Sequence, residues 1–293
     1  MPHATDATLL IFGLGYSGRA VAHAALASGW RVLATTRLPD PTMPAAITPI
    51  PFAAAKAAIA TATHILVTTP PGVTGDPVLT AYATPIRAAT RLRWVGYLST
   101  TGIYGNQNGK WVDEATSPAP NADRSARRLA AEQAWINVAD SRAIDIFRLA
   151  GIYGPGRSAF DDLRAGHARR VIKPGHEFGR IHRDDIAGAV LAAMRQNRQP
   201  GPRILNLSDD EPAESAAVVT EAARLLGIPP SPEIPFAQAW ETMSPMARSF
   251  WSDNRKVSSA RTQEMLGYRW RYPTYREGLR AILREEAANH LPE

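Results

Sequence analysis

The chain has 293 residues, of which 45% are hydrophobic, and it contains no cysteine. This length allows one large domain with a smaller appendage, and the lack of cysteine excludes disulfides, thiolate metal ligands and a cysteine nucleophile. The net charge of +6 comes mainly from arginines dispersed among acidic residues, so it does not indicate a nucleic-acid partner. No apolar stretch is long enough to span a membrane, and the first predicted strand begins too early to leave room for a signal peptide. We therefore expect a cytoplasmic protein with no membrane partner.

The first predicted elements are a strand and a helix joined by a glycine-rich turn. Residues 8–12 form an apolar run that predicts a buried strand, and residues 17–28 predict a helix. The turn between them is GLGYSG, residues 13–18. In a dinucleotide site Gly13 would allow the tight turn, Gly15 the approach of a pyrophosphate and Gly18 close helix packing. The alternative is an ordinary glycine-rich turn that binds no ligand. A second strand at the expected distance favours the dinucleotide site. We expect Tyr16 and Ser17 to contact the cofactor there.

The end of that second strand, residues 31–36, indicates which dinucleotide is bound. An NAD site usually has an acidic residue here that binds the ribose 2′-hydroxyl. This strand instead ends with Thr36 and Arg37, and a guanidinium and a hydroxyl can bind a 2′-phosphate. We therefore expect NADP in preference to NAD. Two alternatives stay open: Asp40 approaches the ribose, or Arg37 is a solvated loop residue.

Strands and helices alternate further along the chain, which predicts a doubly wound parallel sheet covered on both faces. The next strand, residues 64–69, is broken by Pro70 and Pro71, and such a break at a carboxyl end is typical of a ligand crevice. We expect Thr68, Thr69 and Pro70 to contact the cofactor. The remaining expected elements are a helix over 77–90, a strand over 94–99, a helix to 138 capped by Asn121 or Asp123, a strand over 144–149 and a helix over 186–194.

Several segments together resemble the extended short-chain dehydrogenase/reductase superfamily, in its NAD-dependent epimerase/dehydratase branch. They occur in the order and rough spacing of that family, and the resemblance covers nearly the whole chain. The segments are GLGYSG (13–18), LSTTGIYG (98–105), WVDE (111–114), RLAGIYGPG (148–156), IHRDDI (181–186), NLSDDEP (206–212), NRK (254–256) and LGY (266–268). The resemblance implies that Ser99 and Ile152 contact the cofactor and that the protein is a homodimer.

The resemblance also implies a catalytic site, and here the chain departs from the family pattern. Thr100 matches the residue whose hydroxyl binds the reacting carbonyl or alcohol. The next helix normally carries Tyr-x-x-x-Lys, on one helical face, for proton exchange and ribose binding. Counting back from Glu132-Gln133 places Arg124 and Arg128 at these two positions. Arginine stays protonated near neutral pH, so the standard mechanism is in doubt.

The two arginines have alternative roles. Arg128 could supply the lysine's positive charge, and Arg124 could orient an anionic substrate or stabilise an oxyanion. Alternatively both lie on a solvated helix face, with Arg128 paired to Glu132.

Two other residues could then move the proton. Tyr104 follows Thr100 closely, although the usual role of this position is loop packing. His182 titrates in a useful range, although a histidine at a helix start can simply bond to Asp185 or to the backbone. Asp184 and Asp185 suit the positive end of the helix dipole and need no catalytic role, and the scattered histidines show no metal-ligand spacing.

These expectations lead to two functional hypotheses. Residues 1–155, with about 181–207, would form the dinucleotide-binding Rossmann domain, and 156–180 with 208–293 a smaller substrate lobe. Arg157, Arg164 and Arg180 could meet an anionic substrate in the lobe. The first hypothesis is an NADP-dependent oxidoreductase or epimerase-like enzyme that acts on a small carbonyl or sugar-derived compound. The second is a catalytically silent NADP(H)-binding protein that reports redox state to a partner.

Overall fold

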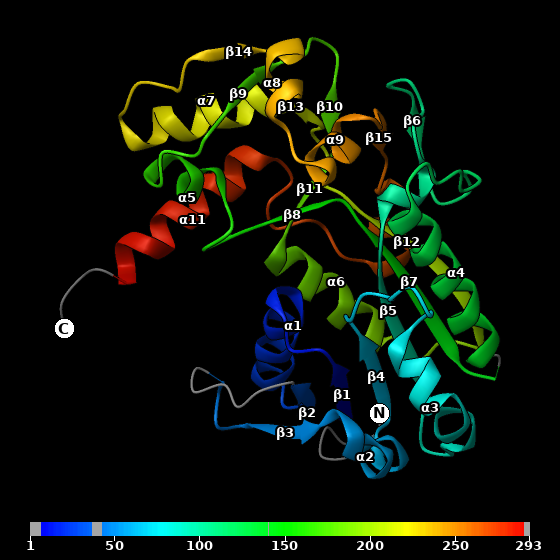
Figure 1. Ribbon diagram of the computed structural model, residues 1–293. Coiled ribbons are helices and arrows are strands. Elements are labelled where there is room, and N and C mark those ends of the chain that lie inside the picture. The colour runs from blue at the N-terminus through cyan, green and yellow to red at the C-terminus, as the bar shows by residue number, and fades with distance from the viewer. Residues whose placement is uncertain (1–6, 37–42, 140, 290–293) are drawn as a thin grey trace.

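The computed structural model describes residues 7–36, 43–139 and 141–289, and a seven-stranded sheet forms its centre (Figure 1). The strand order is β12-β7-β5-β4-β1-β2-β3, and every neighbouring pair is parallel. The chain leaves β1 in one direction to β2 and β3 and returns on its other side to β4, which confirms the predicted doubly wound sheet. The strands are β1 (Thr8–Phe12), β2 (Arg31–Thr36), β3 (Ile47–Pro51), β4 (His64–Val67), β5 (Trp94–Thr100), β7 (Ala143–Leu149) and β12 (Gly201–Leu207).

Helices cover both faces of this sheet, so its central strands are apolar throughout. β1 is fully buried: Leu9 and Ile11 join one hydrophobic cluster, and Leu10 and Phe12 join the other. This division follows from the alternation of side chains along a strand. The first cluster includes α1 (Tyr16–Ala27), α6 (Arg183–Arg195) and α10 (Ala260–Leu266), and the second includes α2 (Ala55–Thr61), α3 (Pro77–Ala88) and α4 (Asp123–Val138).

Smaller elements lie beyond the carboxyl edge of the sheet, in the upper part of Figure 1. A third hydrophobic cluster joins α5, α7 and α11 through buried residues that include Phe160, Val218 and Ile282. The helices of this region are α5 (Ala159–Arg164), α7 (Ser215–Leu226), α8 (Phe236–Thr242), α9 (Pro245–Trp251) and α11 (Tyr275–Asn289). Its strands are β8 (Gly151–Tyr153), β9 (Arg170–Ile172), β10 (Glu177–Phe178), β11 (Arg180–His182), β13 (Ala213–Glu214) and β14 (Glu233–Pro235). The remaining short elements are η3 (Thr101–Tyr104), β6 (Trp111–Val112), β15 (Lys256–Val257) and η2 (Phe52–Ala54). β15 pairs with β6 in parallel.

Several element ends differ from their prediction by one to three residues, and three of these differences have an identified structural reason. β4 ends at Val67, two residues early, at the point where its neighbour β1 ends at Phe12. Neither Asn121 nor Asp123 caps α4: Ala122 is the N-cap residue, and the Asn121 amide instead donates to Asp253 at 3.0 Å. α6 starts at Arg183, three residues earlier than expected, because the His182 side chain caps it.

Candidate functional site

The glycine-rich turn between β1 and α1 has the shape that a dinucleotide phosphate requires. Gly13 has a φ of +95°, and a Cβ on Gly18 would lie 2.4 Å from the carbonyl oxygen of Gly13. A Cβ on Gly15 would meet no heavy atom within 4 Å, so the turn is open at that point. No side chain caps the first turn of α1, which leaves its N–H groups free to bind an anion. The residues therefore fit a nicotinamide dinucleotide.

The side chains expected around the adenosine end are only partly described. The Thr35 hydroxyl accepts a hydrogen bond from the Gly13 N–H at 3.1 Å, so it holds the turn in place. Thr36 follows it at the end of β2 and is half-buried. Arg37 and Asp40 lie outside the described residues. Thr68, whose hydroxyl donates to the Gly13 carbonyl at 2.6 Å, links β4 to the same turn.

A cavity of about 560 Å³ opens at the same edge of the sheet. Its floor is formed by residues that follow β4, β5 and β7, its side by the start of α4, and its roof by β10, α9 and β15. Five of the predicted residues line it, namely Pro70, Thr100, Arg124, Arg128 and Arg180. A parallel sheet gathers its carboxyl ends along one edge, which is why segments distant in sequence meet here.

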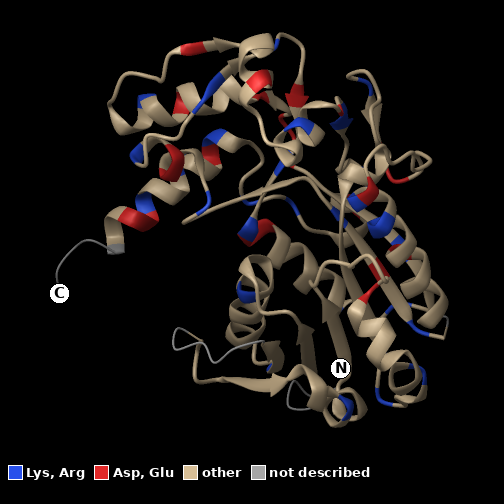
Figure 2. Cartoon of the chain, viewed as in Figure 1, with Lys and Arg blue, Asp and Glu red and all other residues tan. Residues whose placement is uncertain are grey.

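The cavity is basic. Figure 2 shows Lys and Arg residues gathered at the end of α4 that points toward the upper part of the molecule. Five arginines line the cavity: Arg124, Arg127, Arg128, Arg180 and Arg255. Its two acidic residues are already paired, Glu177 with Lys256 at 2.9 Å and Asp253 with Arg255 at 3.0 Å. Of the other arginines expected near a substrate, Arg164 pairs with Glu286 at 2.7 Å, and Arg157 lines a separate, smaller cavity.

Arg128 points toward the sheet edge and not along its own helix. Its Nη1 donates to the Leu98 carbonyl at 3.0 Å, to the Tyr97 hydroxyl at 3.1 Å and to the Thr69 carbonyl at 3.4 Å. Glu132, the alternative partner, is buried and forms an ion pair with Arg148 at 2.9 Å. The guanidinium of Arg128 is therefore fixed between the end of β5 and the segment that follows β4.

Two hydroxyl groups lie together on the cavity wall. The Thr100 hydroxyl oxygen accepts a hydrogen bond from the Gly102 N–H at 3.0 Å, which leaves its hydrogen free to donate. A Cβ on Gly102 would lie 2.9 Å from the Ser125 hydroxyl oxygen and 3.3 Å from that of Thr100. Ser125 was not predicted as a site residue, because its only signal in the sequence is its place one residue after Arg124.

Tyr104 lies outside the cavity, in the protein interior. Its side chain is fully buried, and its hydroxyl donates to Asn206 at 2.8 Å and accepts from Arg148 at 3.0 Å. Burial raises the pKa of this hydroxyl. This geometry agrees with a packing role. The Ser99 hydroxyl also points inward and donates to Glu132, so the side chain of Ser99 is directed away from the cavity. Ile152, the other residue expected to contact the cofactor, lies in β8 and is paired with Ile181 of β11.

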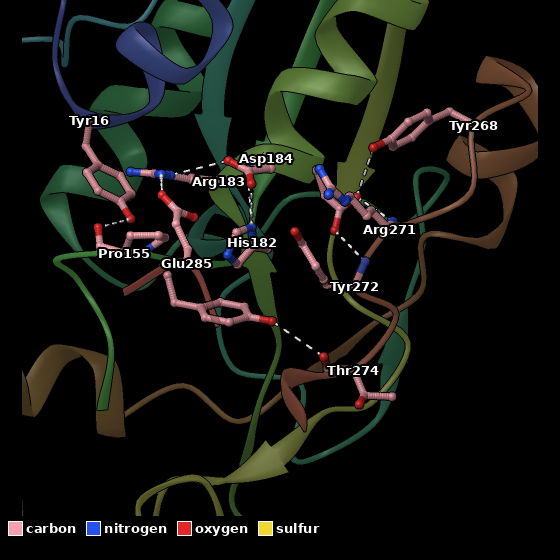
Figure 3. A network of polar contacts seen from close by, with 12 residues as sticks. Tyr16, Pro155, His182, Arg183, Asp184, Tyr268, Arg271, Tyr272, Thr274 and Glu285 are labelled. Carbon is pink, nitrogen blue, oxygen red and sulfur yellow. Dashed lines mark hydrogen bonds and ion pairs between the residues drawn. The ribbon is translucent and has the colours of Figure 1, made fainter. Parts of the chain in front are cut away.

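His182 is buried at the start of α6, in the network of Figure 3. Its Nδ1 accepts the Asp184 N–H at 3.2 Å, so it bonds to the backbone and not to Asp185. Burial lowers the pKa of His182 to about 4, which leaves the ring neutral at pH 7. The nearby Tyr16 hydroxyl donates to the Pro155 carbonyl at 3.0 Å, while Ser17 is buried in α1.

The roof of the cavity was not predicted from the sequence either. Its aromatic residues are Phe178, Phe250 and Trp251, and Arg255 lies beside them. Only Arg255 carried a signal, as part of the late NRK segment. Within the described part of the chain, no group of three or more potential ligands could hold a metal ion. No helix in those ranges has the length and apolar character of a membrane span.

No protein-family model matches the sequence. Some curated proteins are similar to part of it. The 3-diazoavenalumate denitrifying reductase of a Streptomyces species is 29% identical over 171 residues, which are 56% of this chain and 54% of that protein. Protein YeeZ of Escherichia coli K12 is 29% identical over 144 residues, 48% of this chain and 49% of that protein. The chain thus spans about half the length of the curated relatives it matches.

Solved structures are similar over nearly the whole chain. MoeE5, in complex with UDP-glucuronic acid and NAD, is 19% identical with a TM-score of 0.76, over 97% of this chain and 100% of its own. Human SDR39U1, solved with NADPH, is 18% identical with a TM-score of 0.73 over the same shares. At these identities the likeness shows a common fold.

One solved structure is much closer in sequence. A functionally unknown conserved protein from Silicibacter pomeroyi DSS is 43% identical with a TM-score of 0.88, over 96% of this chain and 99% of its own. Because this identity extends over nearly the full length of both chains, the protein belongs to the same family as that conserved Silicibacter pomeroyi protein.

Proposed function

We propose that this protein is an NADP-dependent oxidoreductase of the short-chain dehydrogenase/reductase type that acts on a small anionic carbonyl compound. The observation that carries this proposal is the position of Arg128, which reaches the ends of β4 and β5. With Thr100 it lines a cavity at the same sheet edge as the glycine-rich turn. Residues 1–155 with 181–207 would hold the cofactor, and 156–180 with 208–293 would complete the substrate site. The cofactors named for MoeE5 and SDR39U1 and the activity named for the Streptomyces reductase support this assignment.

The residues of the cavity would take the following roles. A bound nicotinamide cofactor would supply a hydride to the carbonyl carbon of the substrate. Thr100 and Ser125 donate hydrogen bonds to the carbonyl oxygen, and Arg128 stabilises the negative charge that develops there. Because an arginine keeps its proton near neutral pH, the proton that this oxygen gains comes from water at the open side of the cavity.

The preference for NADP is tested by Arg37→Ala. We expect this change to weaken NADPH binding by about 1.5–3 kcal/mol, the loss of a charged hydrogen bond, and to leave NADH binding nearly unchanged. Calorimetric titration with NADPH, NADP, NADH and NAD measures both effects. Arg31→Ala is the matched control, because Arg31 is exposed at the opposite end of the same strand. Equal losses for both cofactors would remove Arg37 from the 2′-phosphate site, and no binding of any cofactor by the unmodified protein would refute the proposed function.

A second candidate function is a silent NADP(H) sensor, and one observation favours it. Among the described residues that line the cavity there is no tyrosine, histidine or lysine, so a protein group that exchanges protons near pH 7 is missing. The double variant Arg124→Tyr/Arg128→Lys restores the family pair in place. If the cavity is otherwise competent, this variant should gain NADPH-dependent reduction across a panel of carbonyl compounds.

The control for this experiment is Arg124→Phe/Arg128→Lys, which has the same ring without its hydroxyl. A gain confined to the tyrosine variant would show that the cavity lacks only a proton donor. Binding of NADPH without turnover by the unmodified protein or by either double variant would favour the sensor.

A further inference from the structure

The cavity has two walls of different chemistry. Basic side chains of α4 form one, with Arg124, Arg127 and Arg128 spaced three and four residues apart on one helical face. Aromatic side chains form the other, with Phe178 from β10 and Phe250 and Trp251 from α9. We call these the basic wall and the aromatic wall.

The three arginines of the basic wall destabilise the start of α4 when no ligand is bound. This cost indicates that an anionic ligand compensates for their charge. The amino end of a helix carries partial positive charge, so cations in its first turns are destabilising. Like charges at i and i+4 repel each other as well. Arg127 makes no hydrogen bond or ion pair with any other described residue, and the acids of the cavity are already paired with Lys256 and Arg255. An anion in the cavity would remove this excess of positive charge.

Two rings of the aromatic wall, Trp251 and Phe178, are held by packing before any ligand arrives. The Trp251 ring stacks on His176 at 5.2 Å between centroids and meets the edge of Phe178 at 5.0 Å. Phe236 packs against Trp251 from another side at 5.4 Å. Because these contacts fix the ring, a flat ligand would bind to it with little loss of side-chain entropy.

Arg124 connects the two walls. Its guanidinium carbon lies 4.0 Å from the centre of the Phe250 ring. A guanidinium that stacks on a ring keeps the N–H groups of its edge available for a carboxylate. The anionic and the flat parts of a ligand would thus be adjacent, within one small molecule.

We propose that this cavity binds a small aromatic carboxylate, with its ring on the aromatic wall and its carboxylate at Arg124 and Arg127. The inference deepens the proposed function, on which it rests, by naming the class of substrate. The cavity volume of about 560 Å³ lies in the lower half of the range for small-molecule sites, and the nicotinamide end of a bound cofactor would take up part of it. That volume favours a ligand of one ring over a sugar nucleotide.

The test is a set of calorimetric titrations on the full-length protein, with and without saturating NADP. The probes are cinnamate, its uncharged analogue cinnamamide, the non-aromatic cyclohexanecarboxylate, and UDP-glucuronate. We expect cinnamate to bind at least ~10-fold more tightly than either analogue, since each analogue lacks one of the two contacts. Arg127→Gln and Phe250→Leu should each weaken cinnamate binding ~10-fold. Both side chains are at least partly exposed, and circular dichroism would verify that the variants are folded.

Arg87→Gln is the matched control, because Arg87 is an exposed arginine on α3, away from the cavity, and it should bind cinnamate as the unmodified protein does. Equal affinity for cinnamate and cinnamamide would overturn the inference. So would UDP-glucuronate binding more tightly than cinnamate, if the Phe250→Leu variant binds UDP-glucuronate as tightly as the unmodified protein. If NADPH binds and none of the three small probes does, the inference fails and the proposed function stands. If cinnamate binds selectively and no dinucleotide binds, the proposed function fails and the ligand class stands.

Discussion

Gly15→Ala is expected to weaken NADPH binding on the order of 100-fold while shifting the thermal unfolding midpoint by less than about 3 °C. A Cβ at this position meets no heavy atom within 4 Å, and its φ of −80° is ordinary for alanine, so the fold accepts the methyl group. The same methyl group would occupy the space through which a pyrophosphate approaches the backbone. Calorimetric titration and a thermal melt of the same sample measure the two effects.

Gly18→Ala is the contrasting variant in the same turn. Its Cβ would lie 2.4 Å from the Gly13 carbonyl oxygen, so the backbone must shift and the protein should lose roughly 1–3 kcal/mol of stability. The pair thus separates an effect on binding from an effect on folding. Unchanged NADPH affinity in Gly15→Ala would show that the phosphates bind elsewhere.

Glu132→Ala is expected to lower the free energy of unfolding by about 3–5 kcal/mol. The Glu132 side chain is 3% exposed, pairs with Arg148 at 2.9 Å and accepts the Ser99 hydroxyl. Removing it leaves the guanidinium of Arg148 buried without its counter-charge, which costs more than the lost contact. Urea denaturation followed by circular dichroism gives the difference.

Two further variants test whether burial of the ion pair causes the expected loss of stability in Glu132→Ala. Arg148→Met in the Glu132→Ala background removes the unpaired charge and should recover part of the loss. Arg164→Ala breaks the exposed pair with Glu286 and should cost at most about 1 kcal/mol. A loss of less than 1 kcal/mol for Glu132→Ala would mean that water reaches Arg148 and that the network does not stabilise the fold.

The sheet and the glycine-rich turn were predictable because their signals are local. The apolar run 8–12 identifies a buried strand by itself, and the spacing of Gly13, Gly15 and Gly18 encodes the geometry of one turn. The start of α4 was less predictable. The amide of Asn121 could cap a helix by its chemistry, but a residue 132 positions away, Asp253, binds it instead.

The proton-transfer candidates show a different limit of the sequence. Tyr104 and His182 have suitable chemistry and follow family motifs, yet both are buried in hydrogen-bonded networks outside the cavity. Burial depends on what other segments place around a residue. The aromatic wall escaped prediction for the same reason, because Phe178 and Trp251 come from short, irregular segments that meet only in the folded protein.

The cluster between α5, α7 and α11 constrains the order in which the chain can fold during its synthesis. Phe160 belongs to this cluster, and Ile282 completes it about 120 residues later. The strands of the central sheet, which end at Leu207, are made before that, and domains tend to fold from the amino-terminal side as they emerge. The floor of the cavity therefore forms first, and α5 and α7 remain partly uncovered until α11 has left the ribosome.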